Sequence, residues 1–171
     1  MNSKERREYI KNLLVTNDNT YKGQFLAAKF GVTRQVIVKD IAIIRAEGVN
    51  IIATPEGYLI PSEESNFVRR VIAVSHGRND IYNELECIVR FGGVIEDVTV
   101  EHPLYGEIRA MLMIKTLVDI EEFTKKFNVS SVQPLSYLTK GIHLHTIKAD
   151  NEEIMESIIK ELEEKNYLIS D

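Results

Sequence analysis

The first sixty residues contain three segments in which apolar side chains recur with the period of an α-helix. In the third segment Ile37, Ile41 and Ile44 fall at positions i, i+4 and i+7 and form one stripe for burial. Gly31 comes before this segment and indicates a tight turn, and Thr33 is well placed to cap the helix that follows. The predicted helices span residues 4–15, 23–30 and 33–47.

Two short apolar runs follow, at residues 49–53 and 58–60, and both are predicted to be strands. The segment between them, Thr54-Pro-Glu-Gly57, has the composition of a turn. Three helices followed by a hairpin are typical of a winged helix-turn-helix. We therefore expect a winged helix-turn-helix DNA-binding domain over residues 1–61.

The rest of the chain alternates between strand and helix patterns in the order β-α-β-β-α-β-α. Three amphipathic helices can cover only one face of such a sheet, so residues 66–171 are predicted to form an α+β open-faced sandwich. The uncovered face must be solvated or pair with another subunit, which favours a homodimer. The predicted strands span residues 67–74, 94–101, 105–114 and 141–148, and the predicted helices span residues 81–91, 117–128 and 151–166.

The composition is that of a globular protein. Of 171 residues, 44% are apolar and 27% are charged, which excludes a disordered chain. The longest apolar run, residues 110–114, is far shorter than the roughly 18 to 20 residues of a membrane-spanning helix. The charged start lacks the apolar core of a signal peptide, and the single Cys cannot form an internal disulfide. We therefore expect a cytoplasmic protein without a membrane partner.

Charge divides the chain at the same place as the element pattern. Residues 1–61 carry nine Lys or Arg against six Asp or Glu, a net charge of +3. Residues 62–171 carry twelve against twenty, a net charge of −8, and the two parts together give the −5 of the chain. This division indicates that only the first part approaches nucleic acid.

The outer face of the third predicted helix carries the candidates for binding operator double-stranded DNA, because the turn before it lets this face enter the major groove. Arg and Gln can make paired hydrogen bonds to guanine and adenine edges, and Val can contact a thymine methyl. Lys suits a phosphate contact. The alternative is a set of solvated charges on a winged helix that contacts protein. The candidate residues are Thr33, Arg34, Gln35, Val36 and Lys39.

Three histidines of the acidic part are candidates for a metal site. His143 and His145 are two apart on a predicted strand, so both rings project from one face while Ile142 and Leu144 point the other way. His76 closes the first strand of this part, where a second chain could bring it beside them. Closely packed imidazoles make each other harder to protonate, and a divalent cation removes this problem because it requires their neutral form.

Glu84 adds a carboxylate to this set. It borders the apolar stripe of the helix that follows His76, where a carboxylate is costly unless it reaches solvent, is hydrogen-bonded or ligates a cation. Three imidazoles and one carboxylate suit a divalent transition metal, namely Zn, Fe, Ni or Mn. The alternative for the His-x-His motif is a pair of surface residues on a strand. The candidate metal ligands are His76, Glu84, His143 and His145.

Two other features each have a structural and a functional interpretation. The segment His102-Pro-Leu-Tyr-Gly106 joins two predicted strands. It is either a rigid turn or the rim of an effector pocket that includes His102 and Tyr105. Cys87 lies in the middle of a predicted helix beside apolar neighbours, which favours packing over a role as a thiolate nucleophile.

Both parts of the chain resemble modules of known regulators. With residues 23–41, Gly48 and residues 56–59, the N-terminal part resembles the winged helix of biotin-repressor-type regulators, which implies DNA binding. With Val74-Ser-His76, Glu84, residues 98–106 and residues 141–145, the C-terminal part is similar to the three-histidine domain of the niacin-responsive repressors.

This resemblance implies a repressor of genes for NAD biosynthesis and niacin uptake that acts when nicotinic acid is plentiful. It also implies a divalent metal in the C-terminal domain and a fold like that of the histidine phosphocarrier protein, without its phosphorylated histidine. Carried over by motif, the metal ligands are again the three histidines and Glu84. His102 is carried only as a residue of the effector pocket, and Arg78 is a candidate partner for the carboxylate of nicotinic acid.

Two rival functions remain open from the sequence. The first is a metal-sensing repressor, in which the cation is the signal and there is no organic effector. The second is a small metallohydrolase fused to a helix-turn-helix, with Glu84 or Glu101 as the base for a zinc-bound water. The chain has no strong catalytic motif, and four ligands would leave little room for such a water.

Overall fold

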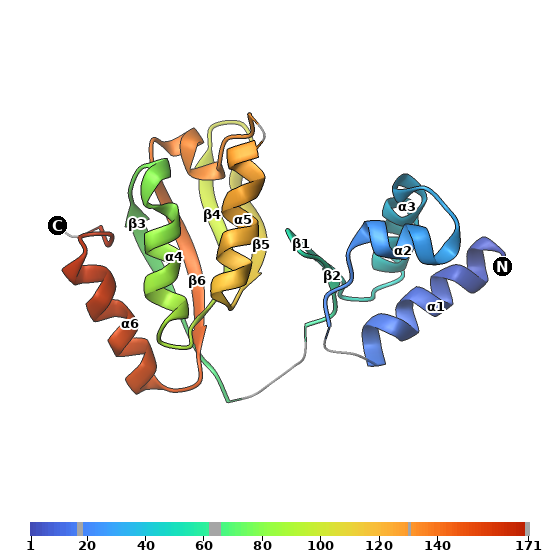
Figure 1. Ribbon diagram of the computed structural model, residues 1–171, viewed down its shortest axis with the longest axis horizontal. Coiled ribbons are helices and arrows are strands. Elements are labelled where there is room, and N and C mark those ends of the chain that lie inside the picture. The colour runs from blue at the N-terminus through green and yellow to red at the C-terminus, as the bar shows by residue number, and fades with distance from the viewer. Residues whose placement is uncertain (17–18, 62–65, 130, 170–171) are drawn as a thin grey trace. The chain divides into compact units, whose positions relative to one another are not determined.

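The computed structural model describes residues 1–16, 19–61, 66–129 and 131–169 (Figure 1). The chain forms two compact units, Met1–Glu63 and Glu64–Asp171. The domain boundaries expected from the sequence, 1–61 and 66–171, leave out residues 62–65, which lie outside the described residues. Among the described helices, none has the length and apolar character needed to cross a bilayer.

The first unit has the element order of a winged helix-turn-helix, as the sequence predicts. Its hydrophobic core is built around the third helix, whose stripe of Ile37, Ile41 and Ile44 is buried. This stripe packs with Ile10 of the first helix and Leu26 of the second. The elements are α1 (Ser3–Thr16), α2 (Gly23–Phe30), α3 (Arg34–Ala46), β1 (Ile52–Thr54) and β2 (Gly57–Leu59).

Two glycines shape the connections of this unit. Gly31 ends α2 with a φ of 64°, a left-handed conformation that glycine adopts without strain, and Thr33 then caps α3 by accepting a hydrogen bond from the Val36 N–H. The wing is tied to the chain before α2 by two backbone hydrogen bonds between Tyr21 and Tyr58, each 2.9 Å long. A Cβ on Gly57 would lie 2.4 Å from the Tyr21 carbonyl oxygen, so this position of the wing accepts only glycine.

A buried ion pair fastens α1 to α3. Asp40 of α3 is 2% exposed, and its Oδ2 lies 2.6 Å from the Nε of Arg6 in α1. Arg7 contributes a second nitrogen, 3.6 Å from Oδ1. Because a buried carboxylate is stable only with a partner, these two arginines hold the helices together. The sequence pattern did not single out Asp40.

We predict that Asp40→Ala lowers the free energy of unfolding by about 3 kcal/mol, because it leaves the largely buried Arg6 guanidinium without its partner. Urea titration followed by circular dichroism measures this loss. Glu164→Ala, which removes one member of the exposed Lys160–Glu164 pair, is the control and should change stability by less than about 0.5 kcal/mol. A loss below about 1 kcal/mol for Asp40→Ala contradicts the assignment of Asp40 as a buried ion-pair partner.

The second unit follows the predicted order β-α-β-β-α-β-α. Its strands form one antiparallel sheet in the spatial order β3-β6-β4-β5. The strands are β3 (Val68–Ser75), β4 (Val94–His102), β5 (Gly106–Ile114) and β6 (Ile142–Ala149), and the helices are α4 (Ile81–Val89), α5 (Leu117–Val129) and α6 (Glu152–Glu164). Two 3-10 turns, η1 (Arg78–Asp80) and η2 (Leu135–Thr139), precede α4 and β6.

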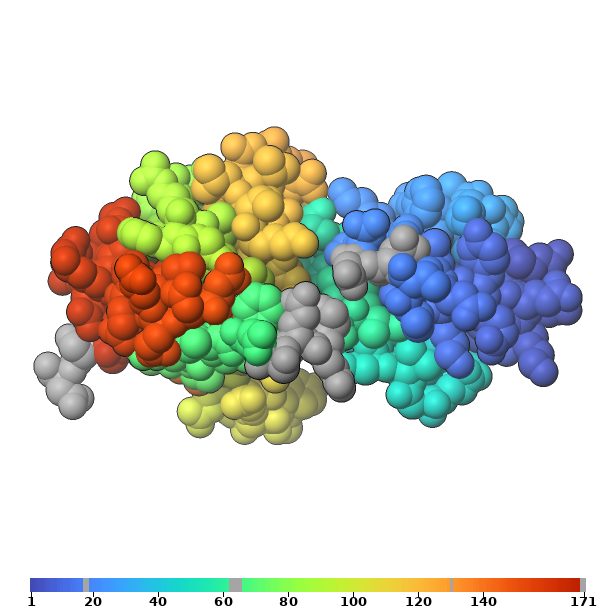
Figure 2. Space-filling model, turned by 90° about the horizontal axis from the view of Figure 1, so that it is seen from below, coloured from blue at the N-terminus to red at the C-terminus, as the bar shows by residue number. Residues whose placement is uncertain are grey.

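The three helices cover one face of this sheet, with α4 between α5 and α6 (Figures 1 and 2). The core lies between them and the sheet, and residues such as Ile88, Ile147 and Ile158 are fully buried. The other face of the sheet carries exposed apolar side chains, including Val71 and Ile142. The open-faced sandwich expected from the sequence is therefore confirmed.

Candidate functional site

The exposed face of α3 displays the residues predicted to bind DNA. Thr33, Arg34, Gln35 and Lys39 are exposed and Val36 is half-buried. The Thr33 hydroxyl is used by the helix cap, and the Arg34 side chain lies beside the start of α2. Arg34 and Gln35 in the first turn are thus presented for base contacts and Lys39, one turn later, for a phosphate. Their roles stay predictions.

The second unit brings the four predicted metal ligands together. His76 follows β3, Glu84 comes from the first turn of α4, and His143 and His145 come from β6. The β3–β6 pairing places His143 opposite Val74 and His145 opposite Ile72, so both rings lie on the face that the helices cover. No second chain is needed to bring His76 beside them, because β3 and β6 are neighbours in one sheet.

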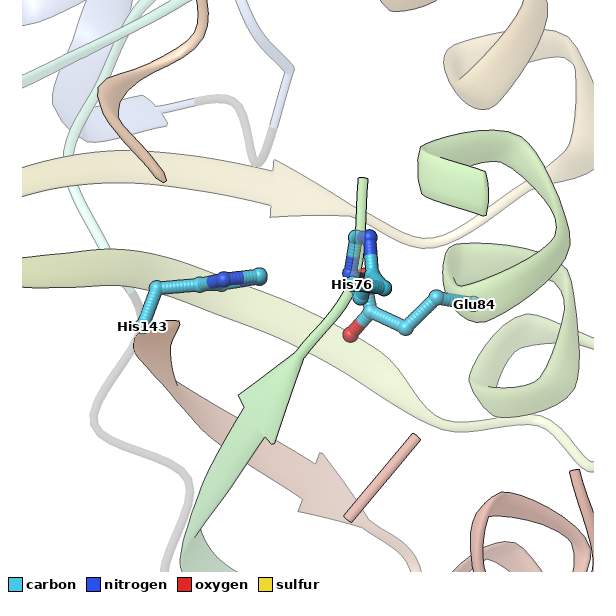
Figure 3. A group of neighbouring side chains, drawn as sticks. All are labelled: His76, Glu84 and His143. Carbon is cyan, nitrogen blue, oxygen red and sulfur yellow. Dashed lines mark hydrogen bonds and ion pairs between the residues drawn. The ribbon is translucent and has the colours of Figure 1, made fainter. Parts of the chain in front are cut away.

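The Glu84 carboxylate contacts two of the three histidines, and Figure 3 shows it beside the His76 ring. Its Oε2 is 3.1 Å from His76 Nε2, and its Oε1 is 3.3 Å from His145 Nε2. Ligand atoms of His76, Glu84 and His143 all lie within 4.8 Å of one another, a spacing that could hold one cation. His145 is not part of this group of three, but its ring is 4.8 Å from the ring of His143 and it contacts the other oxygen of Glu84.

All four side chains are buried, and backbone carbonyls orient the three rings. The Nδ1 atoms of His76, His143 and His145 lie 2.9, 2.8 and 2.5 Å from carbonyl oxygens of Gly77, Gly141 and Asp97. A carbonyl oxygen can only accept, so each Nδ1 carries the proton and, in a neutral ring, Nε2 keeps the lone pair. Metal-ligating histidines are oriented in this way by their second nitrogen.

Comparison with known proteins agrees with this division of the chain. Residues 69–171 match the 3H domain family, and residues 6–59 match a helix-turn-helix domain. The chain is 43% identical over 167 residues to the "Probable transcription repressor NiaR" of Thermotoga maritima, an alignment that covers 98% of this chain and 95% of the relative. The chain belongs to the 3H-domain family of transcription repressors.

One further relative supports this assignment, and another is similar over part of the chain. The "Transcription repressor NadR" of Bacillus subtilis is 37% identical over 169 residues, which covers 97% of this chain and 94% of that protein. An uncharacterized protein of Methanothermus fervidus is 32% identical over 103 residues, which covers 55% of this chain and 16% of the relative. The protein is therefore a DNA-binding regulator and not an enzyme, which sets aside the metallohydrolase.

The charges in the 3H domain cluster balance one another. Burial by itself would raise the pKa of Glu84, but the three histidines, His145 foremost, outweigh it and hold that pKa well below its usual range. Burial would likewise lower the pKa values of His76 and His145, but their contacts with Glu84 raise both. Burial, with His145 alongside, lowers the pKa of His143 to about 4.

The cluster has the donors that a divalent cation needs. Glu84 Oε1 is buried and makes no hydrogen bond to any residue that the structure describes, although His145 Nε2 is within ion-pair distance. A buried acceptor of this kind is costly unless a ligand or water completes it. Together with three Nε2 atoms on oriented rings, this oxygen forms an N/O donor set that suits Zn, Ni, Fe or Mn.

The hairpin residues of the 3H domain have a structural explanation. His102 Nδ1 accepts hydrogen bonds from the N–H groups of Leu104 and Tyr105, at 3.2 and 3.3 Å, and its ring packs on the Tyr105 ring. These bonds favour the interpretation of this segment as a rigid turn between β4 and β5. Tyr105 is 72% exposed, so an effector pocket at this hairpin stays a prediction.

Arg78 is engaged at the end of α5. Its guanidinium donates to the Phe127 carbonyl oxygen, lies 5.2 Å from the centre of the Phe127 ring, and is 3.5 Å from Gln133 Oε1. A cation at a helix C-terminus stabilises the helix dipole. A carboxylate bound by Arg78 would have to share the guanidinium with these groups, so this role too stays a prediction.

Tyr167 is a site residue that the sequence pattern did not reveal. Its ring packs edge-on against His76 at 5.5 Å, because the chain after α6 returns to the edge of β3. There the Tyr167 carbonyl accepts from the Ser75 N–H at 3.0 Å.

Cys87 is buried, which raises the pKa of its thiol. The thiol donates to the Asn83 carbonyl, which agrees with the packing role that the sequence favours.

We predict that a cation binding to this cluster releases protons, because a metal must displace them from His76 and His145. Calorimetric titration with Zn²⁺ near pH 7, in buffers of different ionisation enthalpy, should detect roughly one to two protons per ion. Because the pKa values of His76 and His145 are raised, the affinity for the cation should still increase with pH above about 6.5, the ordinary histidine pKa. His145→Ala should release fewer protons than His143→Ala, since His143 is already neutral; equal release in both variants contradicts this assignment.

Proposed function

We propose that this repressor controls genes of NAD biosynthesis and niacin uptake, and that it binds operator DNA in response to nicotinic acid through a metal-containing 3H domain. The observation that carries the proposal is the buried Glu84 carboxylate, which lies between His76 Nε2 and His145 Nε2 and has a ring nitrogen of His143 within 4.8 Å. The similarity to the NiaR and NadR repressors, and the resemblance to niacin-responsive repressors, supply the class of genes and effector.

The cluster is suited to an effector that combines a pyridine nitrogen with a carboxylate. His76, His143 and Glu84 would hold the cation, with His145 on the second oxygen of Glu84. A bound divalent cation supplies a Lewis acid that accepts a nitrogen or carboxylate donor. The protein's own contribution is to keep the rings oriented by the carbonyls of residues 77, 97 and 141 and to exclude water from Glu84.

A homodimer would present two copies of α3 to the operator. Helix-turn-helix dimers read half-sites separated by about one turn of duplex or a multiple of it. The open face of the sheet supports self-association, since Val71, Ile142 and Leu144 are exposed there. The effector then acts only through its differential affinity for the arrangement of the two DNA-binding units that fits the operator. Sedimentation equilibrium of the free protein checks the oligomeric state.

We predict different effects for two kinds of α3 residue. Arg34→Ala should relax base preference at one position and weaken operator binding by about 1–3 kcal/mol. Lys39→Ala should weaken binding to all sequences alike and lower the salt dependence by about one ion. Fluorescence anisotropy on a duplex selected by the protein from a random pool, and on its scrambled form, measures both. Lys160→Ala on α6 is an exposed control; an Arg34→Ala protein with unchanged preference contradicts the role of Arg34.

We predict that nicotinic acid raises the melting temperature of the metal-loaded protein, because a ligand of the native state stabilises it by about 2.7 kcal/mol at a hundredfold excess over its dissociation constant. The rise should vanish after chelation and return with Zn²⁺ or Ni²⁺. His143→Ala and Glu84→Ala should abolish it, while His102→Ala tests the hairpin separately. Full effector affinity in both cluster variants overturns the proposal, and operator binding that follows metal alone selects the metal sensor.

A further inference from the structure

A β-bulge in the central strand β4 lies directly behind the histidine cluster. Residues 95–99 of β4 lie opposite residues 144–147 of β6, so β4 carries one extra residue in this pairing. In the pairing with β5 the extra residue lies on β5, where residues 111–114 lie opposite residues 95–97 of β4. Bulges interrupt the hydrogen-bond ladder and re-aim one residue, and they are frequent beside functional sites. Here the re-aimed residue is Asp97, which is 1% exposed.

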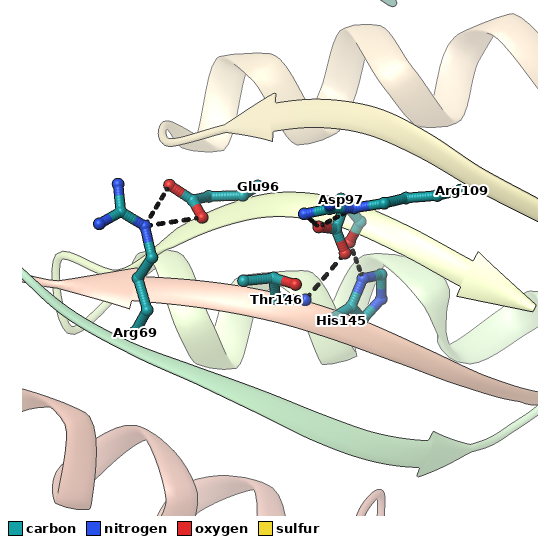
Figure 4. A network of polar contacts seen from close by, with 6 residues as sticks. All are labelled: Arg69, Glu96, Asp97, Arg109, His145 and Thr146. Atoms are coloured by element: carbon teal, nitrogen blue, oxygen red, sulfur yellow. Dashed lines mark hydrogen bonds and ion pairs between the residues drawn. The ribbon is translucent and has the colours of Figure 1, made fainter. Parts of the chain in front are cut away.

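The Asp97 side chain fills the gap that this bulge leaves in the ladder. Its Oδ1 accepts the Thr146 N–H of β6 at 3.0 Å, a backbone donor that would otherwise pair with a carbonyl. Its Oδ2 accepts from Arg109 of β5, with Nε at 2.7 Å and a second contact from the guanidinium (Figure 4). The side chain therefore binds both neighbouring strands and holds the bulge in one conformation.

The backbone of the same residue reaches the cluster. The Asp97 carbonyl oxygen lies 2.5 Å from His145 Nδ1, and His145 Nε2 is in turn 3.3 Å from Glu84 Oε1. Carbonyls of Gly77 and Gly141 orient the other two rings from the same segment of chain, one or two residues away. His145 alone depends on a residue of another strand, 48 positions away along the chain.

Glu96, the residue before Asp97, provides a natural comparison. It is also buried, at 8% exposure, and it pairs with an arginine, since Arg69 Nε lies 3.1 Å from both of its oxygens (Figure 4). Glu96 and Asp97 are neighbours in β4, but they pair in opposite directions across the sheet. Glu96 pairs with an arginine of β3, and Asp97 pairs with an arginine of β5. Among the described contacts of these two pairs, only the Asp97 pair is connected to the cluster, through the Asp97 carbonyl and His145.

We propose that Asp97, held by Arg109, is a positioning residue that fixes the orientation and the protonated nitrogen of His145. This inference rests on the proposed metal-binding function for its consequence, but its physical content is a property of the protein without metal. Loss of the Asp97 side chain frees the Thr146 N–H and the Arg109 guanidinium. The bulge then relaxes, and its carbonyl no longer points at His145 Nδ1.

The first arm of the test is NMR of metal-free full-length protein labelled with ¹⁵N-histidine. In wild type, the His145 Nδ1 proton should give a slowly exchanging resonance, assigned by its absence from His145→Gln. Asp97→Ala should abolish this resonance, and Asp97→Asn, which keeps an acceptor for Thr146, should weaken it. Arg109→Gln should change it in the same direction. Glu96→Gln and Arg69→Gln are the matched controls and should leave it unchanged.

The second arm measures Co²⁺ affinity and the visible spectrum of the bound ion in the same variants. Removing a group that orients a metal-ligating histidine weakens metal binding by about 10- to 100-fold. We expect a loss in this range for Asp97→Ala, about tenfold for Asp97→Asn, and wild-type affinity for Glu96→Gln. If Asp97→Ala does not fold, Asp97→Asn and Arg109→Gln decide the outcome.

The two arms separate this inference from the metal site itself. A wild-type protein that binds no Co²⁺ overturns the metal proposal, while the NMR arm still decides the role of Asp97. A His145 Nδ1 resonance that is unchanged from wild type in both Asp97→Asn and Arg109→Gln overturns the positioning role. Equal losses in Glu96→Gln also overturn it, because the effect would then belong to any buried ion pair on this face.

Discussion

The carboxylate of Glu84 is the constraint around which the 3H domain is arranged. It is 1% exposed at the first turn of α4, and a charge in that position is tolerated only with cationic or metal partners. His76 and His145 satisfy this requirement as protonated neighbours, and with the proposed cation the three histidines would satisfy it as co-ligands. The same contacts hold the pKa of Glu84 low and raise those of His76 and His145, so a metal proposed for this cluster would have to displace protons from both rings.

The sheet order makes this cluster possible. Because β6 lies between β3 and β4, its two histidines have His76 on one side and the Asp97 bulge on the other. The alternation of β6 then points both histidines into the covered face and leaves Ile142 and Leu144 on the open one. One strand thus contributes both to the site and to the face proposed for self-association.

The DNA-binding unit depends on how firmly its third helix is held in place. The three isoleucines of its third helix, α3, pack into the hydrophobic core, and the ion pair of Asp40 with Arg6 joins α3 to α1. A helix held on two sides can present its remaining face, with Arg34 and Lys39, in a constant orientation. Rigidity of this unit would matter in the proposed dimer, because an effector bound to the other unit could act only by favouring one arrangement of two rigid DNA-binding units.

The sequence by itself determined the order of the elements, the helix-turn-helix and the candidate cluster, because these depend on local periodicity, turn residues and the His-x-His spacing. It could not find Asp97, Asp40 or Tyr167, whose partners lie far away along the chain. It also could not decide the hairpin of His102, where only the tertiary structure showed Nδ1 occupied by turn N–H groups. Strand register, burial and the direction of a carbonyl arise from packing between distant segments, so the folded chain alone decides them.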